Sequence, residues 1–102
     1  MKIIKPSTVR AWARMYPAAS ASLLGWLALM KAAKFGDFAS LRATFALADM
    51  VRVKSGRKVI VFNIGGNNYR LIVAVHFNTQ RAFALRLMTH ADYSKDKWKE
   101  IL

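Results

Sequence analysis

Among its 102 residues the chain has no cysteine, two prolines and five acidic residues. The absence of cysteine excludes disulfides, thiolate zinc sites and a cysteine nucleophile, and it is compatible with a reducing compartment. The five acidic residues are scattered along the sequence, which argues against a mechanism that needs paired carboxylates. We therefore expect a cytoplasmic protein whose fold is held by its hydrophobic core, without covalent cross-links.

Long apolar runs are also missing, although apolar residues make up 55% of the chain. A bilayer span requires about 20 consecutive apolar residues. The best candidate, residues 18–33, contains two serines and a lysine, follows Pro17, and begins too far inside the chain to be a signal peptide. We expect no membrane association, a buried or partner-covered helix here, and a single domain over residues 1–102.

Positive charge is abundant, with 17 basic residues and a net charge of +12. The basic side chains are spread along the chain, without a polybasic tail. Such a balance attracts polyanions, so the expected partner is a nucleic acid, an acidic protein or an anionic membrane surface, and the alternative is a generic soluble basic protein. Charge alone does not choose among these three.

The hydrophobic pattern predicts an α+β fold with two helices packed on one face of a mainly antiparallel sheet. A short strand at residues 1–5 is followed by helices at 7–16 and from 18 or 21 to 34. Residues 36–49 fit a loop or a short helical turn. Strands follow at 50–54, 58–64, 68–77 and 81–89, and a short helix at 92–102. Trp26 lies off the apolar stripe of its helix, so it is either buried under the next loop or part of a protein-binding patch.

The alternation of side chains along a strand assigns residues to the two faces of the sheet. A three-residue turn centred on Thr79 would pair Arg70 with Met88 and Asn68 with His90. With an even loop between the preceding strands, one face gathers the polar residues Asn63, Asn68, Arg70, Arg86 and His90. The helix-covered face takes Phe83, Leu85 and Leu87. The small residues Ala74, Ala82 and Ala84 leave the polar face shallow and uncovered.

Two arginines, two asparagines and a histidine on one face predict an anion or RNA site, because guanidinium binds two phosphate oxygens at once. Ordinary solvated charge is the alternative for each residue taken alone. The Gly65-Gly66 loop joins two strands and opens no helix, so it is not a dinucleotide or P-loop motif. Neither histidine has a metal-ligand partner at suitable spacing, and we expect no metal.

Two segments, "VFNIGGNNYRLI" and "MTHADY", give the chain a recognisable signature. With these motifs it resembles the HigB family of bacterial type II toxin-antitoxin systems, which have a RelE-like fold, and the resemblance covers nearly the whole chain. It implies an endoribonuclease that uses no metal or other cofactor and cleaves mRNA on the ribosome by attack of the 2'-hydroxyl on the adjacent phosphate. It also implies a helix-turn-helix antitoxin of the HigA type, through which alone the toxin would meet operator DNA.

The resemblance also suggests roles for individual residues. Asn68 and Arg70 lie in the matching Asn-Tyr-Arg segment, and His90 and Tyr93 in the matching Thr-His-x-x-Tyr segment. Arg70 would clamp the transition state. His90 is the first candidate for general base or acid, since histidine titrates near neutrality, and Tyr93 would stack on a base or donate a proton. Arg86 would hold a neighbouring phosphate.

The sequence leaves open the role of three further basic residues and two alternatives to a nuclease. Lys54, Arg57 and Lys58 surround a hairpin turn, where they would either meet ribosomal RNA or only keep the protein in solution. The first alternative to a nuclease is a non-catalytic RNA- or ribosome-binding module that uses the same basic face. The second is an interaction subunit that docks an acidic protein through the apolar helices and Trp26.

Overall fold

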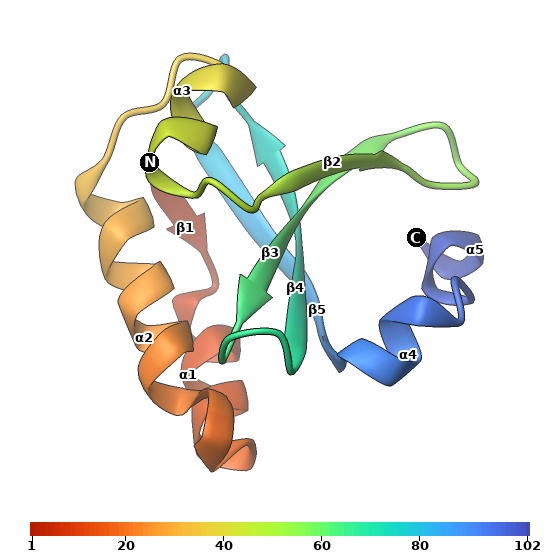
Figure 1. Cartoon of the computed structure of the whole chain (residues 1–102). Coiled ribbons are helices and arrows are strands. Elements are labelled where there is room, and N and C mark those ends of the chain that lie inside the picture. The colour runs from red at the N-terminus through yellow and green to blue at the C-terminus, as the bar shows by residue number, and fades with distance from the viewer.

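The computed structural model describes all 102 residues and has an α+β architecture with a five-stranded mixed sheet (Figure 1). In chain order the elements are β1 (Lys2–Ile4), α1 (Pro6–Met15), α2 (Pro17–Ala32), α3 (Phe38–Thr44), β2 (Asp49–Arg52), β3 (Lys58–Ile64), β4 (Tyr69–His76), β5 (Arg81–Thr89), α4 (His90–Ser94) and α5 (Trp98–Ile101). The strand order is β1-β5-β4-β3-β2, with β1 parallel to β5 and the other pairs antiparallel. The predicted fold class is confirmed.

Helices α1 and α2 cover one face of the sheet, as the pattern predicted (Figure 1). They bury Val9, Leu23 and Met30 against Phe62 and Leu71 in the larger of two core clusters, which has 18 buried residues. The second helix begins at Pro17, because proline suits the first helical position, where no backbone N–H is needed. None of the helices combines the length and the apolar character that a bilayer-spanning segment needs.

Trp26 is buried, with 3% of its surface exposed, and its ring meets Phe62 edge to face at 5.5 Å. The interpretation of Trp26 as part of a protein-binding patch is therefore wrong, and its burial is confirmed. The outer side of α2 still exposes Leu24 and Leu29.

The segment 36–49, expected to be a loop or helical turn, contains α3. This helix begins with a capping box. The Asp37 carboxylate accepts a hydrogen bond from the Ser40 backbone N–H at 2.8 Å, and the Ser40 hydroxyl accepts one from the Asp37 N–H. Such reciprocal bonds satisfy donors that a short helix leaves free at its start.

The loop between β3 and β4 has the even length that was expected, and it pairs Asn63 with Arg70. Gly65 and Gly66 have φ of +61° and +68°, a left-handed conformation that glycine adopts without strain. The Gly65 N–H donates to the Ser22 hydroxyl of α2 at 2.9 Å. Glycine thus allows the turn and ties its tip to the helical layer.

The pairing of β4 with β5 differs from the prediction near the turn and agrees with it at the other end. Residues 77–80 form a four-residue loop, one residue longer than expected, and a bulge between Ile72 and Val73 compensates for it. The bulge leaves Leu85 as the extra residue on β5. Beyond it, Arg70 pairs with Met88, as predicted.

The longer loop changes which β5 residues face the helices. Ala82 and Ala84 pack in the large core cluster, whereas Phe83 pairs with Ala74 on the other face and Leu85 packs there too. The predicted assignment of these four β5 residues is wrong, because a one-residue shift exchanges the two faces of a strand. Leu87, beyond the bulge, is on the expected face.

The C-terminal segment forms two short helices, α4 and α5, where one was expected, and they lie on the other side of the sheet from α2 (Figure 1). Trp98, 3% exposed, packs there with Val59, Val61 and Ile72 in the second core cluster. The expectation that this face is uncovered is wrong. A single large aromatic side chain in a polar segment is enough to bring the segment onto the sheet.

Candidate active site around Arg70

Arg70 lies in the middle of the sheet, between Asn63 of β3 and Met88 of β5. It faces away from α1 and α2, as expected, but only 8% of its surface is exposed. It is the only buried charged side chain of the protein. The expected open, shallow surface around Arg70 is therefore not present, because α4 and α5 cover this face.

The Arg70 guanidinium is held by the loop that precedes β4. Its Nη1 donates to the carbonyl oxygens of Asn67 at 3.3 Å and Tyr69 at 3.1 Å, and its Nη2 donates to Asn67 Oδ1 at 2.6 Å. No carboxylate pairs with it, since the two ion pairs of the protein join Lys95 to Asp92 and Lys99 to Asp96. A buried cation that is balanced only by neutral dipoles favours the approach of an anion.

Tyr93 of α4 lies over this guanidinium, with the Arg70 Cζ atom 5.5 Å from the centre of its ring. The other side of Tyr93 is supported by Trp98, whose ring stacks on it at 5.3 Å and whose Nε1–H donates to the Tyr93 carbonyl at 3.1 Å. Burial raises the pKa of the Tyr93 phenol above 10.0, and the nearby Asp49 carboxylate adds to this, while Lys99 and Arg70 oppose it. Tyr93 is therefore neutral near pH 7, able to donate a proton and not to accept one.

The raised pKa gives a measurable pH dependence. In a titration followed by phenolate absorbance, we expect a late ionisation step above pH 10.0, and Tyr93→Phe to remove this late step. Because the unfolded chain releases the proton first, the contribution of Tyr93 to stability is full below pH 10 and declines as pH rises toward the folded pKa. A late step that persists in Tyr93→Phe would contradict the assignment.

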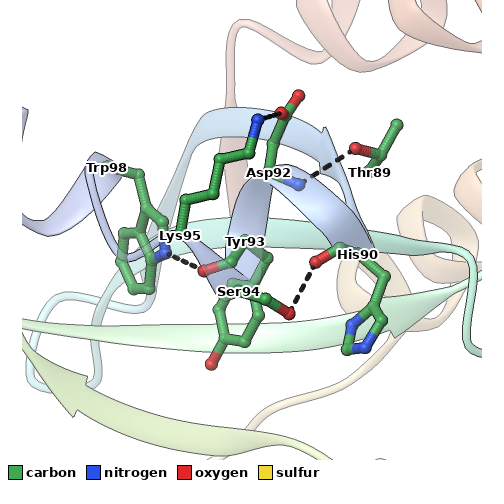
Figure 2. A network of polar contacts seen from close by, with 7 residues as sticks. All are labelled: Thr89, His90, Asp92, Tyr93, Ser94, Lys95 and Trp98. Carbon is green, nitrogen blue, oxygen red and sulfur yellow. Dashed lines mark hydrogen bonds and ion pairs between the residues drawn. The ribbon is translucent and has the colours of Figure 1, made fainter.

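His90 is exposed at the first position of α4. Its backbone N–H donates to the Asn68 carbonyl at 2.9 Å, which confirms the predicted closeness of these two residues. Thr89 caps α4 by accepting a bond from the Asp92 N–H at 3.2 Å, and the Ser94 hydroxyl donates to the His90 carbonyl. Figure 2 shows the imidazole of His90 and the ring of Tyr93 projecting from the same side of α4.

The remaining predicted residues lie at different distances from this centre. Asn63 is half-buried beside Arg70, and Asn68 is exposed in the loop just before β4. Arg86 is exposed on β5, opposite Ile72. The last three, Lys54, Arg57 and Lys58, are exposed at the far end of β3. Lys58 lies five positions before Asn63, which is roughly 17 Å along a strand, so this group does not belong to the same site.

Sequence reasoning missed two residues that shape the site. Asn67 holds the guanidinium, and its position three residues before Arg70 in the Gly-Gly-Asn-Asn turn was a usable signal. Trp98 supports Tyr93, and the signal was an isolated tryptophan in an otherwise polar segment. Both act by fixing the groups that face the candidate substrate.

Comparison with known proteins identifies the family of the chain. Residues 19–96 match the family described as HigB_toxin, RelE-like toxic component of a toxin-antitoxin system. The mRNA interferase HigB of Escherichia coli O6:H1 is 30% identical over 95 residues, which is 93% of this chain and 90% of that protein. The mRNA interferase toxin HigB of E. coli K12 is 29% identical over 93 residues, covering 91% of this chain and 88% of that protein. The chain therefore belongs to the HigB family of RelE-like toxins, the toxic components of toxin-antitoxin systems.

Proposed function

We propose that this toxin is a metal-independent endoribonuclease that cleaves mRNA and thereby inhibits translation. Its family implies a cognate antitoxin, and the relatives described above are named mRNA interferases. The observation that carries the proposal is the buried guanidinium of Arg70 on the central strand β4, which has no carboxylate partner and lies under the ring of Tyr93.

The chemistry follows from these groups. A general base, for which His90 is our candidate, removes the proton of a ribose 2'-hydroxyl, and the 2'-oxygen bonds to the adjacent phosphorus. The bond from phosphorus to the 5'-oxygen breaks, and this oxygen takes up a proton, for which the neutral Tyr93 phenol is the candidate donor. The products are a 2',3'-cyclic phosphate and a 5'-hydroxyl. Arg70 binds the phosphoryl oxygens as negative charge builds up on them.

The fixed hydrogen bonds of Arg70 support its role as a transition-state clamp. Asn67 and the Tyr93 ring hold the guanidinium in place before substrate arrives, so little reorganisation is needed during the reaction. Because Arg70 is 8% exposed and the Tyr93 ring lies over it, Tyr93 limits the access of a phosphate to the guanidinium. Asn68, exposed in the adjacent loop, is placed to orient the ribose.

We further propose that the RNA is mRNA on the ribosome and that the antitoxin is of the helix-turn-helix, HigA type, so that operator DNA is contacted only through it. Lys54, Arg57 and Lys58 would dock on ribosomal RNA, away from the catalytic centre. Loss of these charges would then weaken docking in a salt-dependent way and leave the chemical step unchanged.

The experiment that tests the proposal is the mapping of transcript ends after brief production of the toxin without its antitoxin. A nuclease leaves new 5'-hydroxyl ends within coding regions inside minutes. The main rival, a non-catalytic RNA- or ribosome-binding module, would arrest translation with intact transcripts. Absence of new ends in cells whose translation has stopped would decide for that rival.

A further inference from the structure

A cleft lies next to the catalytic arrangement described above and shares Trp98 and Arg86 with it. It has a volume of about 340 Å³ and opens between β5, the helices α4 and α5, and Tyr16 at the junction of α1 and α2. We propose that this cleft binds the nucleotide that flanks the scissile phosphate, and that it thereby sets the sequence preference of the toxin. The inference rests on the proposed nuclease function and assigns a substrate position that this function leaves open.

The cleft exists because β5 has a free edge. Its parallel neighbour β1 pairs only with Arg81, Ala82 and Phe83, so the remaining two thirds of β5 have no strand on that side. The cleft follows this edge along residues 86–89. Backbone N–H and C=O groups that point outward from an unpaired edge are available to the polar edges of a base, and unstacked bases in single-stranded RNA are read through such edges.

The positive charge of the residues that line the cleft suits a negatively charged nucleotide. Arg86, Lys95 and Lys97 line it, and the only acidic lining residue is Asp92. Asp92 is paired with Lys95 at 3.6 Å, and both side chains are more than 60% exposed. An exposed pair of this kind is weak, so Lys95 can exchange the carboxylate for a phosphate at little cost.

Aromatic side chains form the opposite wall. Tyr16 and Tyr69 meet edge to face at 5.8 Å, and both are half-buried. They offer ring surface to a base, as proteins that bind single-stranded RNA commonly do. An acidic peptide would use the positive charge of the cleft, but it would not use these rings, and we therefore favour RNA.

The cleft lies next to Arg70, as expected if the two bind adjacent nucleotides of one RNA strand. Met88 lines the cleft and is the β5 partner of Arg70, and Thr89 lines it and caps α4. Figure 2 shows Asp92 and Lys95 projecting from the side of α4 opposite to His90 and Tyr93. An RNA strand that crosses α4 near Thr89 would thus present one phosphate to the catalytic side and the next nucleotide to the cleft.

The test uses translated reporter messengers in which the nucleotides flanking one mapped cut are randomised, and it measures cutting rates by sequencing the ends. The parent toxin should prefer certain bases at one flanking position. The double variant Lys95→Ala, Lys97→Ala should cut all messengers about tenfold more slowly, since both lysines contact phosphate. Tyr16→Ala should reduce the preference at that position about tenfold. The exposed pair Lys31→Ala, Lys34→Ala on α2 and just after it is the charge-matched control and should behave as the parent.

Three results would overturn the inference. Unchanged rates and preferences in both cleft variants would show that no nucleotide occupies the cleft, while the continuing cleavage would leave the proposed function intact. Absence of cleavage by the parent would reject the function and the subsite together. Cleft variants that cut like the parent but escape neutralisation by the antitoxin would assign the cleft to a protein partner. Because Lys95 and Lys97 are exposed, their substitution should leave the fold unchanged, which keeps the test valid if Tyr16→Ala proves unstable.

Discussion

Replacement of Arg70 by alanine should lower the rate of mRNA cleavage at least 100-fold and relieve growth arrest when the toxin is produced without its antitoxin. The guanidinium is the one buried charged side chain of the protein, and it is fixed by Asn67 and Tyr93 before substrate binds. Loss of one preorganised donor to a developing oxyanion typically reduces rate by 10²- to 10³-fold. Quantification of cut and intact messenger over time, at equal toxin concentration, gives the rate ratio.

The controls for this substitution separate catalysis from folding. Removal of the guanidinium loses its charge-assisted hydrogen bonds to Asn67 and Tyr69, so Arg70→Ala should also destabilise the protein by about 1.5–3 kcal/mol, to be checked by thermal unfolding. Arg70→Lys keeps the charge but not the planar two-pronged donor and should recover only part of the rate. Arg81→Ala removes an exposed arginine from the other end of β5 and should act as the parent does. Full toxicity of a folded Arg70→Ala protein would refute the proposed clamp.

Replacement of Trp98 by alanine should cost about 3–5 kcal/mol of stability, the range for a large buried aromatic residue. Trp98 is 3% exposed, stacks on Tyr93 and anchors the small core cluster beneath α5. Few other contacts hold this segment: the Lys54 N–H donates to the Lys99 carbonyl, and the Ser55 hydroxyl to the Leu102 carbonyl. Measurement by denaturant unfolding gives the free energy directly.

The same substitution should affect cleavage, because Tyr93 and His90 belong to the segment that Trp98 holds. We expect hydrogen exchange in α4 and α5 to become fast while the strands stay protected, and cleavage to fall with it. Trp98→Phe retains a ring against Tyr93 and loses the bond to its carbonyl, for a cost of about 1 kcal/mol. Ile101→Ala, at a residue that is 64% exposed on the same helix, should change stability by less than about 0.5 kcal/mol. Equal loss of protection in sheet and helices would show that the segment does not open by itself.

The antitoxin is expected to act on a toxin whose positive charge is largely uncompensated. Seventeen basic residues are opposed by five acidic ones, and both ion pairs are local contacts three residues apart. Such a surface attracts RNA and an acidic antitoxin alike. The two partners need not share one surface, since Leu24 and Leu29 leave an apolar area on α2, away from Arg70.

Local patterns in the sequence were sufficient for most element types and for the face of the sheet on which Arg70 lies. Alternation along β3 and β4 placed Arg70 on the face away from the helices, and the Gly65-Gly66 turn set its pairing with Asn63. These features depend on residues close in sequence, whose geometry the strand period and the turn chemistry largely determine. The family signature in the same segments led independently to the RelE-like toxins.

The register of β5 was decided by tertiary contacts. The four-residue loop after β4 and the bulge at Leu85 shift the strand by one residue and back again, so Phe83 and Ala82 exchange faces while Arg86 and Met88 keep theirs. Lengthening the loop by one residue changes the local free energy little. Burial of the whole strand therefore selects between the two possible registers of β5.

The sequence by itself determined that the protein is free of cysteine, is basic and has an α+β fold with Arg70 in its sheet. These properties follow from the composition, the motif spacing and the strand period, which depend on residues close together in the chain. Only the tertiary structure decided that Arg70 is buried, because its cover is formed by Tyr93 and Trp98, more than twenty residues farther along the chain. The burial of one tryptophan against the sheet brings these residues over the guanidinium, and no local pattern records which surface a distant aromatic side chain will choose.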